Sequence, residues 1–173
     1  MIYQNAMVFG PDFRFHKGGF AVEGGRFSRV LTVGEAEGTD LGGLYVVPGF
    51  IDVHNHGNSG KDFSDGDDEG LKTLARYLAK NGVTSFAPAS VTLPESQLKT
   101  AYESAARFAK AAPAGCARLR GIHMEGPFFS EKKKGAQNGA YLQNPNYEMF
   151  LRLNAAADWL INITHVAPEL PVA

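Results

Sequence analysis

The chain has 173 residues, of which 44% are hydrophobic and 20% are charged, and its formal net charge is -1. Both values are ordinary for a globular protein, and one domain typically contains about 100–200 residues. The balanced charge offers no basic excess for nucleic acid or for an anionic membrane surface, so we expect neither partner.

The compartment is predicted from what the sequence lacks. Cys116 is the only cysteine, so no disulfide can form within one chain, as is typical of a reducing cytoplasm. The N-terminus shows no basic start followed by an apolar stretch, and no segment approaches the roughly 20 apolar residues of a membrane span. We therefore expect a cytoplasmic protein without a signal peptide.

Residues 1–47 contain short apolar segments separated by turn residues. Strands are predicted over residues 2–9, 19–22 and 27–33, since Gly and Pro bound each of them. This pattern indicates a small β module. The nearly continuous apolar run over residues 45–53 then predicts a strand buried on both faces, as in a parallel sheet.

Two helices and a strand follow that run. Apolar residues at helical spacing predict a helix over residues 67–80, and the next strand is predicted over residues 83–88. Thr92 and Glu95 have the spacing of a capping box, in which the side chains of the two residues satisfy backbone N–H groups at a helix start. The second helix is expected to end before Pro113.

The remaining elements complete an alternating order. A strand is predicted over residues 119–125, a polar loop over 126–144, a short helix over 145–154 and a strand over 160–166. Strands that alternate with helices favour parallel βαβ units. The predicted fold class is α/β, with residues 48–173 forming the first four units of a (β/α)8 barrel, which typically needs about 250 residues.

The first candidate site lies just after the strand predicted within residues 45–53. His54 and His56 are two residues apart, so strand alternation places both imidazoles on one face. Imidazole is the commonest protein metal ligand, and barrel chemistry sits at the C-terminal ends of strands. Such an H-x-H pair also occurs in copper sites and in ordinary loops. The pair on its own therefore does not distinguish a hydrolase metal site from these two alternatives.

The second candidate site is the end of the strand predicted over residues 119–125. Glu125 follows an apolar strand, and a carboxylate there is costly to bury unless a cation or hydrogen-bond donors meet it. It is therefore a candidate metal ligand, the alternative being a solvated or Arg-paired glutamate. His123 lies on the same face, and we expect it to support the ligands through a hydrogen bond, or to pack in the core, rather than to bind the metal itself.

Other polar residues carry weaker signals. The lysines of residues 132–134 are typical of a solvated loop, whereas Gln137 and Asn138, together with Ala136, are candidate substrate contacts. Asp65, Asp67 and Asp68 do not fit a calcium loop, and a helix N-terminus explains them.

Two histidines lie outside these candidate sites. His16 is expected to be exposed. His165, near the end of the fourth barrel strand, is read as a packed strand residue rather than a ligand. The sequence shows no Ser-His-Asp arrangement and no phosphate-binding glycine loop.

Several of these segments resemble one enzyme family. Residues 47–57 (VPGFIDVHNHG) resemble the first barrel strand of the amidohydrolase superfamily. Residues 121–129 (GIHMEGPFF) and 133–137 (KKGAQ) resemble the third-strand motif and the following loop of the N-acetylglucosamine-6-phosphate deacetylases. Residues 81–86 and 167–169 also fit that family. The resemblance covers essentially the whole chain.

The resemblance implies a barrel that holds one or two divalent ions, zinc or iron, and a small β-sandwich to which residues 1–47 contribute. The implied reaction is removal of the acetyl group from N-acetylglucosamine 6-phosphate to give glucosamine 6-phosphate and acetate. Glu125 matches the shared metal ligand, and His54 and His56 match a pair that only some members carry. Gln137 falls where the family contacts the sugar, and the complete enzyme is expected to be a homodimer.

The chain departs from the family in its extent. The general-base Asp and two metal-binding histidines of the family come from later strands, so no catalytic acid–base residue is expected here. The resemblance therefore implies an N-terminal half that is inactive or nearly so alone. One alternative is an amidohydrolase for cyclic amides, which commonly uses a carboxylated lysine on the fourth strand. Another is a non-catalytic truncated or split product.

Overall fold

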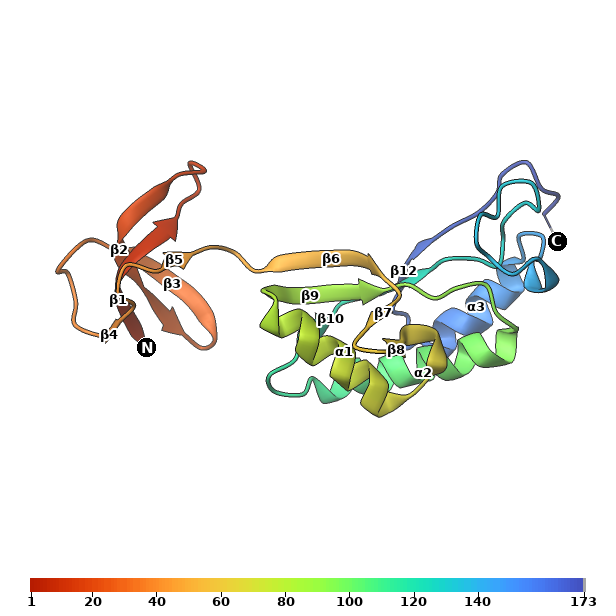
Figure 1. The fold of residues 1–173 in the computed structure, drawn as a ribbon, viewed down its shortest axis with the longest axis horizontal. Coiled ribbons are helices and arrows are strands. Elements are labelled where there is room, and N and C mark those ends of the chain that lie inside the picture. Colours follow the sequence, from red (N-terminus) through yellow and green to blue (C-terminus); the bar gives the residue numbers. More distant parts are fainter. Residues whose placement is uncertain (173) are drawn as a thin grey trace. The chain divides into compact units, whose positions relative to one another are not determined.

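The computed structural model describes residues 1–172, which fall into two compact units (Figure 1). The first unit comprises Met1–Pro48, and the second begins at Gly49. None of the helices in this part of the chain combines the length and the apolar character that crossing a bilayer would require.

The first unit is a five-stranded sheet. Its strands are β1 (Ile2–Phe9), β2 (Phe15–Glu23), β3 (Arg26–Leu31), β4 (Thr39–Asp40) and β5 (Tyr45–Val46). The three long strands pair as antiparallel hairpins in the order β3-β2-β1, and β4 and β5 both pair with β1 in parallel. The β module is therefore present, although β2 starts four residues earlier than predicted and β3 ends two residues sooner.

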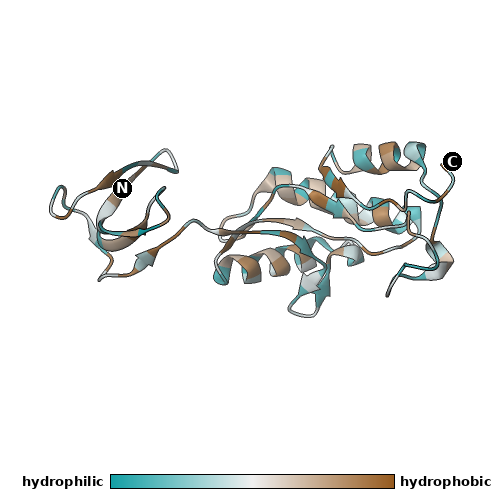
Figure 2. Cartoon of the chain, turned by 90° about the horizontal axis from the view of Figure 1, so that it is seen from above, coloured by the Kyte–Doolittle hydropathy of each residue, from teal (hydrophilic) through white to brown (hydrophobic). Residues whose placement is uncertain are grey.

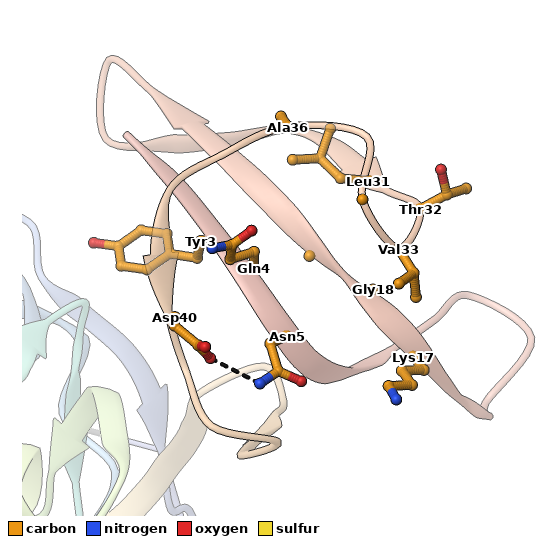
Figure 3. Close-up of a pocket in the computed structure, with 12 residues that line it drawn as sticks. Tyr3, Gln4, Asn5, Lys17, Gly18, Leu31, Thr32, Val33, Ala36 and Asp40 are labelled. Carbon is orange, nitrogen blue, oxygen red and sulfur yellow. Dashed lines mark hydrogen bonds between the residues drawn. The ribbon is translucent and has the colours of Figure 1, made fainter.

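The first unit also carries a groove of about 250 Å³ (Figure 3). Gly18 and Gly19 lie along it, and a Cβ atom at either position would come within 2.2 Å of a backbone carbonyl oxygen of a neighbouring strand. Across the groove, the amide of Asn5 donates a hydrogen bond of 2.8 Å to Asp40. Glycine is thus needed where the strands approach each other closely.

The apolar run over residues 45–53 is not one strand, which corrects the prediction. β5 ends at Val46 and β6 (Phe50–Asn55) begins four residues later. Pro48 interrupts pairing because proline has no N–H to donate to a sheet. Burial on both faces was also wrong: β6 lies at one end of its sheet, and the side chains of Phe50 and Ile51 are 65% and 71% exposed.

The second unit alternates strands and helices in chain order. After β6 come β7 (Gly57–Asn58), β8 (Lys61–Asp62), η1 (Phe63–Asp65), α1 (Asp68–Lys80), β9 (Val83–Pro88), α2 (Glu95–Ala111) and β10 (Arg118–Leu119). The last elements are β11 (Ile122–Met124), η2 (Gly139–Tyr141), α3 (Tyr147–Ala156) and β12 (Ile161–Thr164). The predicted order of barrel strands and helices is confirmed, with short additional elements between them.

The strand predicted over residues 119–125 is divided in two. β10 pairs with β9, whereas β11 pairs with β12, and Arg120 and Gly121 separate them. A Cβ atom at Gly121 would lie 2.8 Å from the amide nitrogen of Asn162, so the break places the backbone close to the next strand. A parallel bridge between Ala89 and His123 links β11 to the end of β9. The strands thus follow one another in parallel as in the first half of a (β/α)8 barrel.

The helices cover one side of these strands. α1 and α2 run beneath β6, β9 and β10 (Figure 1), and hydrophobic and hydrophilic residues alternate along them (Figure 2). Their apolar faces pack into one core, whose largest fully buried side chains include Leu74, Phe86, Leu98 and Tyr102. This packing supports the strand ends at which the candidate site lies.

The start of α1 agrees with the prediction, but the start of α2 does not. Asp67 caps α1 by accepting the N–H of Glu69 at 3.1 Å, as expected for an acidic residue at a helix N-terminus. The predicted capping box is wrong, because Pro94 is the N-cap of α2 and makes no side-chain cap hydrogen bond. The Thr92 hydroxyl is buried without a hydrogen-bond partner, and Glu95 instead binds Arg152 of α3 at 2.7 Å.

Candidate metal centre

The candidate ligands lie at the C-terminal ends of β6 and β11, two parallel strands on either side of β9. His54 is near the end of β6, His56 follows it, and Glu125 follows β11. The carboxylate of Asp52 accepts the backbone N–H of His54 at 3.0 Å and the side-chain amide of Asn55 at 3.1 Å. Asp52 therefore stabilises the end of β6 in a shape that directs both imidazoles to one side.

Three ligand atoms converge there. His54, His56 and Glu125 each present one atom, and these atoms lie within 4.8 Å of one another. Oε2 of Glu125 is 3.0 Å from Nε2 of His56 and 3.9 Å from Nε2 of His54. This oxygen is buried, yet no hydrogen bond of normal geometry reaches it. Two imidazole nitrogens and a carboxylate oxygen form a donor set that suits a divalent ion such as zinc or iron.

A backbone carbonyl determines which nitrogen of His56 is available. Nδ1 of His56 lies 3.0 Å from the carbonyl oxygen of Ala89, just beyond β9. A carbonyl only accepts hydrogen bonds, so Nδ1 carries a proton and Nε2 is the nitrogen that a cation could bind. Nε2 faces Oε2 of Glu125 at 3.0 Å, and such outer contacts are the usual way in which a metal-binding imidazole is oriented.

Gly57 lets the chain turn immediately after these histidines. A Cβ atom at this position would lie 2.0 Å from the backbone oxygen of Lys61, in the short hairpin formed by β7 and β8. The N–H of Phe63 then returns to the carbonyl oxygen of His56 at 2.7 Å. The segment after β6 is thus folded back tightly against the candidate site.

His123 is buried beside the three candidate ligands. Its Nδ1 lies 3.1 Å from Nδ1 of His54 and 3.2 Å from the carbonyl oxygen of Val53. Burial lowers the pKa of His123, and the neighbouring imidazoles of His165 and His54 lower it further. The neutral imidazole is therefore favoured at this position.

The structure places His165 differently from the sequence interpretation. His165 follows β12, and its Nε2 lies 3.2 Å from Nε2 of His123, while its Nδ1 is 4.0 Å from Oε1 of Glu125. It is therefore part of the histidine cluster rather than only a packed strand residue. The sequence contained one signal for this: like His54 and Glu125, His165 comes at a strand end.

The candidate substrate residues make contacts of their own. The side-chain oxygen of Gln137 accepts the N–H of Thr92 at 2.6 Å, and Asn138 caps η2 by accepting the N–H of Ala140 at 3.0 Å. Ala136 is exposed beside them. The same loop includes Lys134, whose ammonium group donates to the carbonyl oxygen of Gln137 at 3.0 Å. Contact with a sugar remains a prediction for these residues.

Known proteins with similar sequences match this part of the chain. The amidohydrolase family model matches residues 45–173. The chain is 34% identical over 125 residues to an N-acetylglucosamine-6-phosphate deacetylase of Vibrio furnissii, covering 72% of this chain and 30% of the relative. It is 39% identical over 140 residues to the Homo sapiens enzyme of the same name, covering 78% of this chain and 34% of the relative.

The fold matches solved structures over nearly its whole length. The chain superimposes on N-acetylglucosamine-6-phosphate deacetylase from Pasteurella multocida with a TM-score of 0.85 and 27% sequence identity, covering 98% of this chain and 45% of that one. It thus spans about a third of the curated relatives and less than half of this structure. The family model, these similarities and the strand-end position of the three candidate ligands lead to one conclusion: the chain belongs to the amidohydrolase family.

Proposed function

We propose that this chain forms the first part of a metal-dependent N-acetylglucosamine-6-phosphate deacetylase. The enzyme would hydrolyse the N-acetyl amide of N-acetylglucosamine 6-phosphate to glucosamine 6-phosphate and acetate in amino-sugar catabolism. The observation that supports this most is the convergence of His54, His56 and Glu125 at the strand ends of a partial barrel. The names of the relatives at 34% and 39% identity supply the substrate class.

The proposed site uses atoms whose positions are described above. Nε2 of His54, Nε2 of His56 and Oε2 of Glu125 would hold a divalent ion, zinc or iron. When bound, such an ion supplies Lewis acidity that acidifies water and polarises an amide carbonyl. The negative carboxylate of Glu125 would bind the ion directly, while the Ala89 carbonyl fixes the ring orientation of His56. Gln137 and Asn138, with Ala136, would contact the sugar.

The general base of the reaction is expected outside this chain. Among the described residues, no aspartate belongs to the group of three candidate ligands. We propose that a later strand supplies an Asp for proton transfer, and that this chain alone is inactive or nearly so and binds metal weakly. In the complete enzyme, residues 1–47 would form part of a small β-sandwich and residues 48–173 the first four barrel units, with two copies forming a dimer.

The runner-up is an amidohydrolase for cyclic amides. Those enzymes commonly bridge two ions with a carboxylated lysine on the fourth strand. Here the fourth barrel strand, β12, contains no lysine, and Glu125 supplies the carboxylate from the third. The deacetylase is therefore the better supported activity.

A metal titration tests the proposed site directly. We expect Glu125→Gln to weaken Zn²⁺ or Co²⁺ binding by the 173-residue chain at least tenfold, because the amide loses the negative charge that faces both imidazoles. The matched control is Glu131→Gln, an exposed carboxylate in the following loop, which should leave binding unchanged. Equal binding by wild type and Glu125→Gln would contradict the site.

Turnover tests the proposed activity. Acetate release from N-acetylglucosamine 6-phosphate should be undetectable with the purified chain, strong once the chain is joined to the later barrel strands, and lost in Glu125→Gln of that completed enzyme. Turnover of a cyclic amide instead would favour the runner-up. Robust turnover by the pure 173-residue chain would contradict the assignment of the general base to a later strand.

A further inference from the structure

Two residues that follow β9, Ala89 and Ser90, join the strands that carry the candidate ligands. The N–H of Ala89 donates to the carbonyl oxygen of Asn55 in β6 at 2.9 Å, whereas the N–H of Ser90 donates to the carbonyl oxygen of His123 in β11 at 3.1 Å. Over the residues that the structure describes, β6 pairs with β9 and β11 pairs with β12, but β6 and β11 do not pair with each other. The Ala89–Ser90 segment therefore determines how the ends of β6 and β11 lie relative to each other.

The same segment contacts a candidate ligand directly. The carbonyl oxygen of Ala89 lies 3.0 Å from Nδ1 of His56, so the position of this oxygen fixes the orientation of the ring. Nε2 of that ring faces Oε2 of Glu125 at 3.0 Å. The methyl side chain of Ala89 cannot form a hydrogen bond that would hold its own backbone in place, so the constraint has to come from a neighbouring residue.

Ser90 supplies this constraint through a buried hydrogen bond. Its Oγ lies 2.8 Å from the hydroxyl oxygen of Tyr102 in the middle of α2, and both residues are fully buried. Burial raises the pKa of the Tyr102 phenol, which therefore stays a neutral hydroxyl group. Because a buried hydroxyl is costly to leave without a partner, the pair ties the Ala89–Ser90 segment to the helix layer.

Tyr102 also supports the chain on the other side of His56. Its ring stacks on that of Phe63, with centroids 6.1 Å apart and an interplanar angle of 17°. The N–H of Phe63 donates to the carbonyl oxygen of His56 at 2.7 Å. Tyr102 therefore contacts both segments that hold His56, with its hydroxyl acting through Ser90 and its ring through Phe63.

We propose that Ser90 and Tyr102 are positioning residues of the metal centre, which hold the Ala89 carbonyl in place and through it the imidazole of His56. This inference rests on the proposed metal site. Neither residue belongs to the group of three candidate ligands. Removing their hydrogen bond lets the Ala89–Ser90 segment move, and the ring of His56 then loses its fixed orientation toward Glu125.

The test separates metal affinity from stability. In Zn²⁺ or Co²⁺ titrations of the 173-residue chain, Tyr102→Phe and Ser90→Ala should each weaken binding about fivefold. This is less than the roughly 10–100-fold typical of groups that contact a ligand directly, because both residues act through Ala89. In urea unfolding, Ser90→Ala should lower the midpoint most, since it leaves the Tyr102 hydroxyl buried without a partner.

The double variant Ser90→Ala/Tyr102→Phe decides between positioning and simple core stability. It removes both polar groups, so its unfolding midpoint should recover towards that of wild type. Its metal affinity should nevertheless stay about fivefold below wild type, because the Ala89–Ser90 segment is still not tied to α2. If midpoint and affinity recover together, the pair is purely structural and the proposal is overturned.

Ser104→Ala is the matched control. Ser104 lies on the same helix and is also buried, but its hydroxyl donates to Asp68 of α1 at 2.5 Å and not to the end of β9. The variant should lower the midpoint in urea and leave the metal affinity at the wild-type value. An affinity loss equal to that of Tyr102→Phe would show that affinity merely follows stability, which contradicts the positioning role.

Amide hydrogen exchange measures the positioning without an ion. In the metal-free chain, Tyr102→Phe should speed exchange at the N–H groups of Ala89 and Ser90 by a larger factor than at Leu74 in α1, which reports the general loss of stability. An equal change at all three positions would indicate general loosening and would also overturn the proposal.

The affinity of Glu125→Gln distinguishes failure of this proposal from failure of the metal site. If Glu125→Gln binds like wild type, the site itself fails and the positioning role fails with it. If Glu125→Gln loses affinity while Tyr102→Phe and Ser90→Ala bind like wild type, only the positioning role is overturned and the site stands.

Discussion

His54 and His56 are two residues apart, yet different kinds of atoms orient them. His56 is oriented by a main-chain carbonyl, whereas His54 contacts the side chain of His123. Alternation along a strand and the rule that barrel chemistry follows strand ends were enough to select His54, His56 and Glu125. His165 could not be ranked in the same way, because its partners depend on which strand β11 pairs with.

Gly126 is the residue at which local backbone shape most directly affects the site. It follows Glu125 with a φ of 88°, and a Cβ atom there would lie 2.1 Å from the hydroxyl oxygen of Thr92. Gly126→Ala should lower the free energy of unfolding by about 2–4 kcal/mol, since left-handed strain and overpacking add. Urea unfolding followed by the fluorescence of Trp159, the only tryptophan, measures this loss.

Gly115 provides the matched control for that substitution. It lies in the same unit with a φ of 72°, but nothing is within 4 Å of the Cβ position. Gly115→Ala should therefore cost only the backbone strain, about 1 kcal/mol. Equal losses for the two variants would show that contact with Thr92 is unimportant.

Among the helices and strands, regular apolar periodicity predicted the observed bounds better than apolar runs and short motifs did. The strand β9 has the predicted bounds, and α1 begins one residue after the predicted start, because both have clear apolar patterns. The run over residues 45–53 and the strand over 119–125 were each predicted as one element and are each divided. Apolar character alone does not show where a strand changes partner, since pairing is decided by residues distant in sequence.

Whether the Thr92 hydroxyl caps α2 can be tested by removing it. Thr92 lies two residues before the N-cap of α2, and its buried hydroxyl has no partner. Thr92→Val keeps the side-chain shape and removes an unsatisfied polar group, so the free energy of unfolding should be unchanged or should rise by up to about 1 kcal/mol. A capping hydroxyl would give the opposite sign, a loss of about 1 kcal/mol.

The N-cap of α3 serves as the reference for a true cap. The side chain of Asn146 accepts the N–H of Met149 at 2.9 Å. Asn146→Ala should therefore lower stability by about 1 kcal/mol in the same urea titration. A loss of similar size in Thr92→Val would restore the capping interpretation.

Across the whole molecule, both units contain carboxylates that favour the charged form. The pKa is lowered for six of them: Asp12, Glu35, Asp40, Asp67, Asp68 and Glu95. The largest causes differ, for example a side-chain hydrogen bond from Arg107 to Asp68 and from Arg152 to Glu95. All six are at least partly exposed to solvent, so each contributes little by itself.

Because the pKa of all six carboxylates is lowered in the folded state, they affect stability in the same way as the pH falls. A carboxylate with a lowered folded-state pKa stabilises the fold above its unfolded pKa, near 3.8 for Asp and 4.5 for Glu, and loses this effect as pH falls through the folded value. From these six groups, we expect the midpoint of thermal unfolding to stay constant between pH 7 and about pH 5. We expect it to decrease once the pH is lowered past about 4. Circular dichroism melts at a series of pH values measure it.

Two arginines allow a control for the acid response. The double variant Arg107→Gln/Arg152→Gln removes the largest causes for Asp68 and Glu95, so its midpoint should fall less steeply between pH 5 and pH 3. A wild-type midpoint that stays level or rises down to pH 3 would contradict the expectation.

The carbonyl of Ala89 has a consequence for how this protein is studied genetically. Its oxygen contacts Nδ1 of His56, and every amino acid carries the same oxygen, so a substitution at the fully buried Ala89 changes the packing without removing the oxygen. Side-chain mutagenesis therefore cannot isolate the contribution of this oxygen to the site. Only chemistry that edits the polypeptide backbone itself, such as an ester in place of the amide between residues 89 and 90, would reveal its contribution.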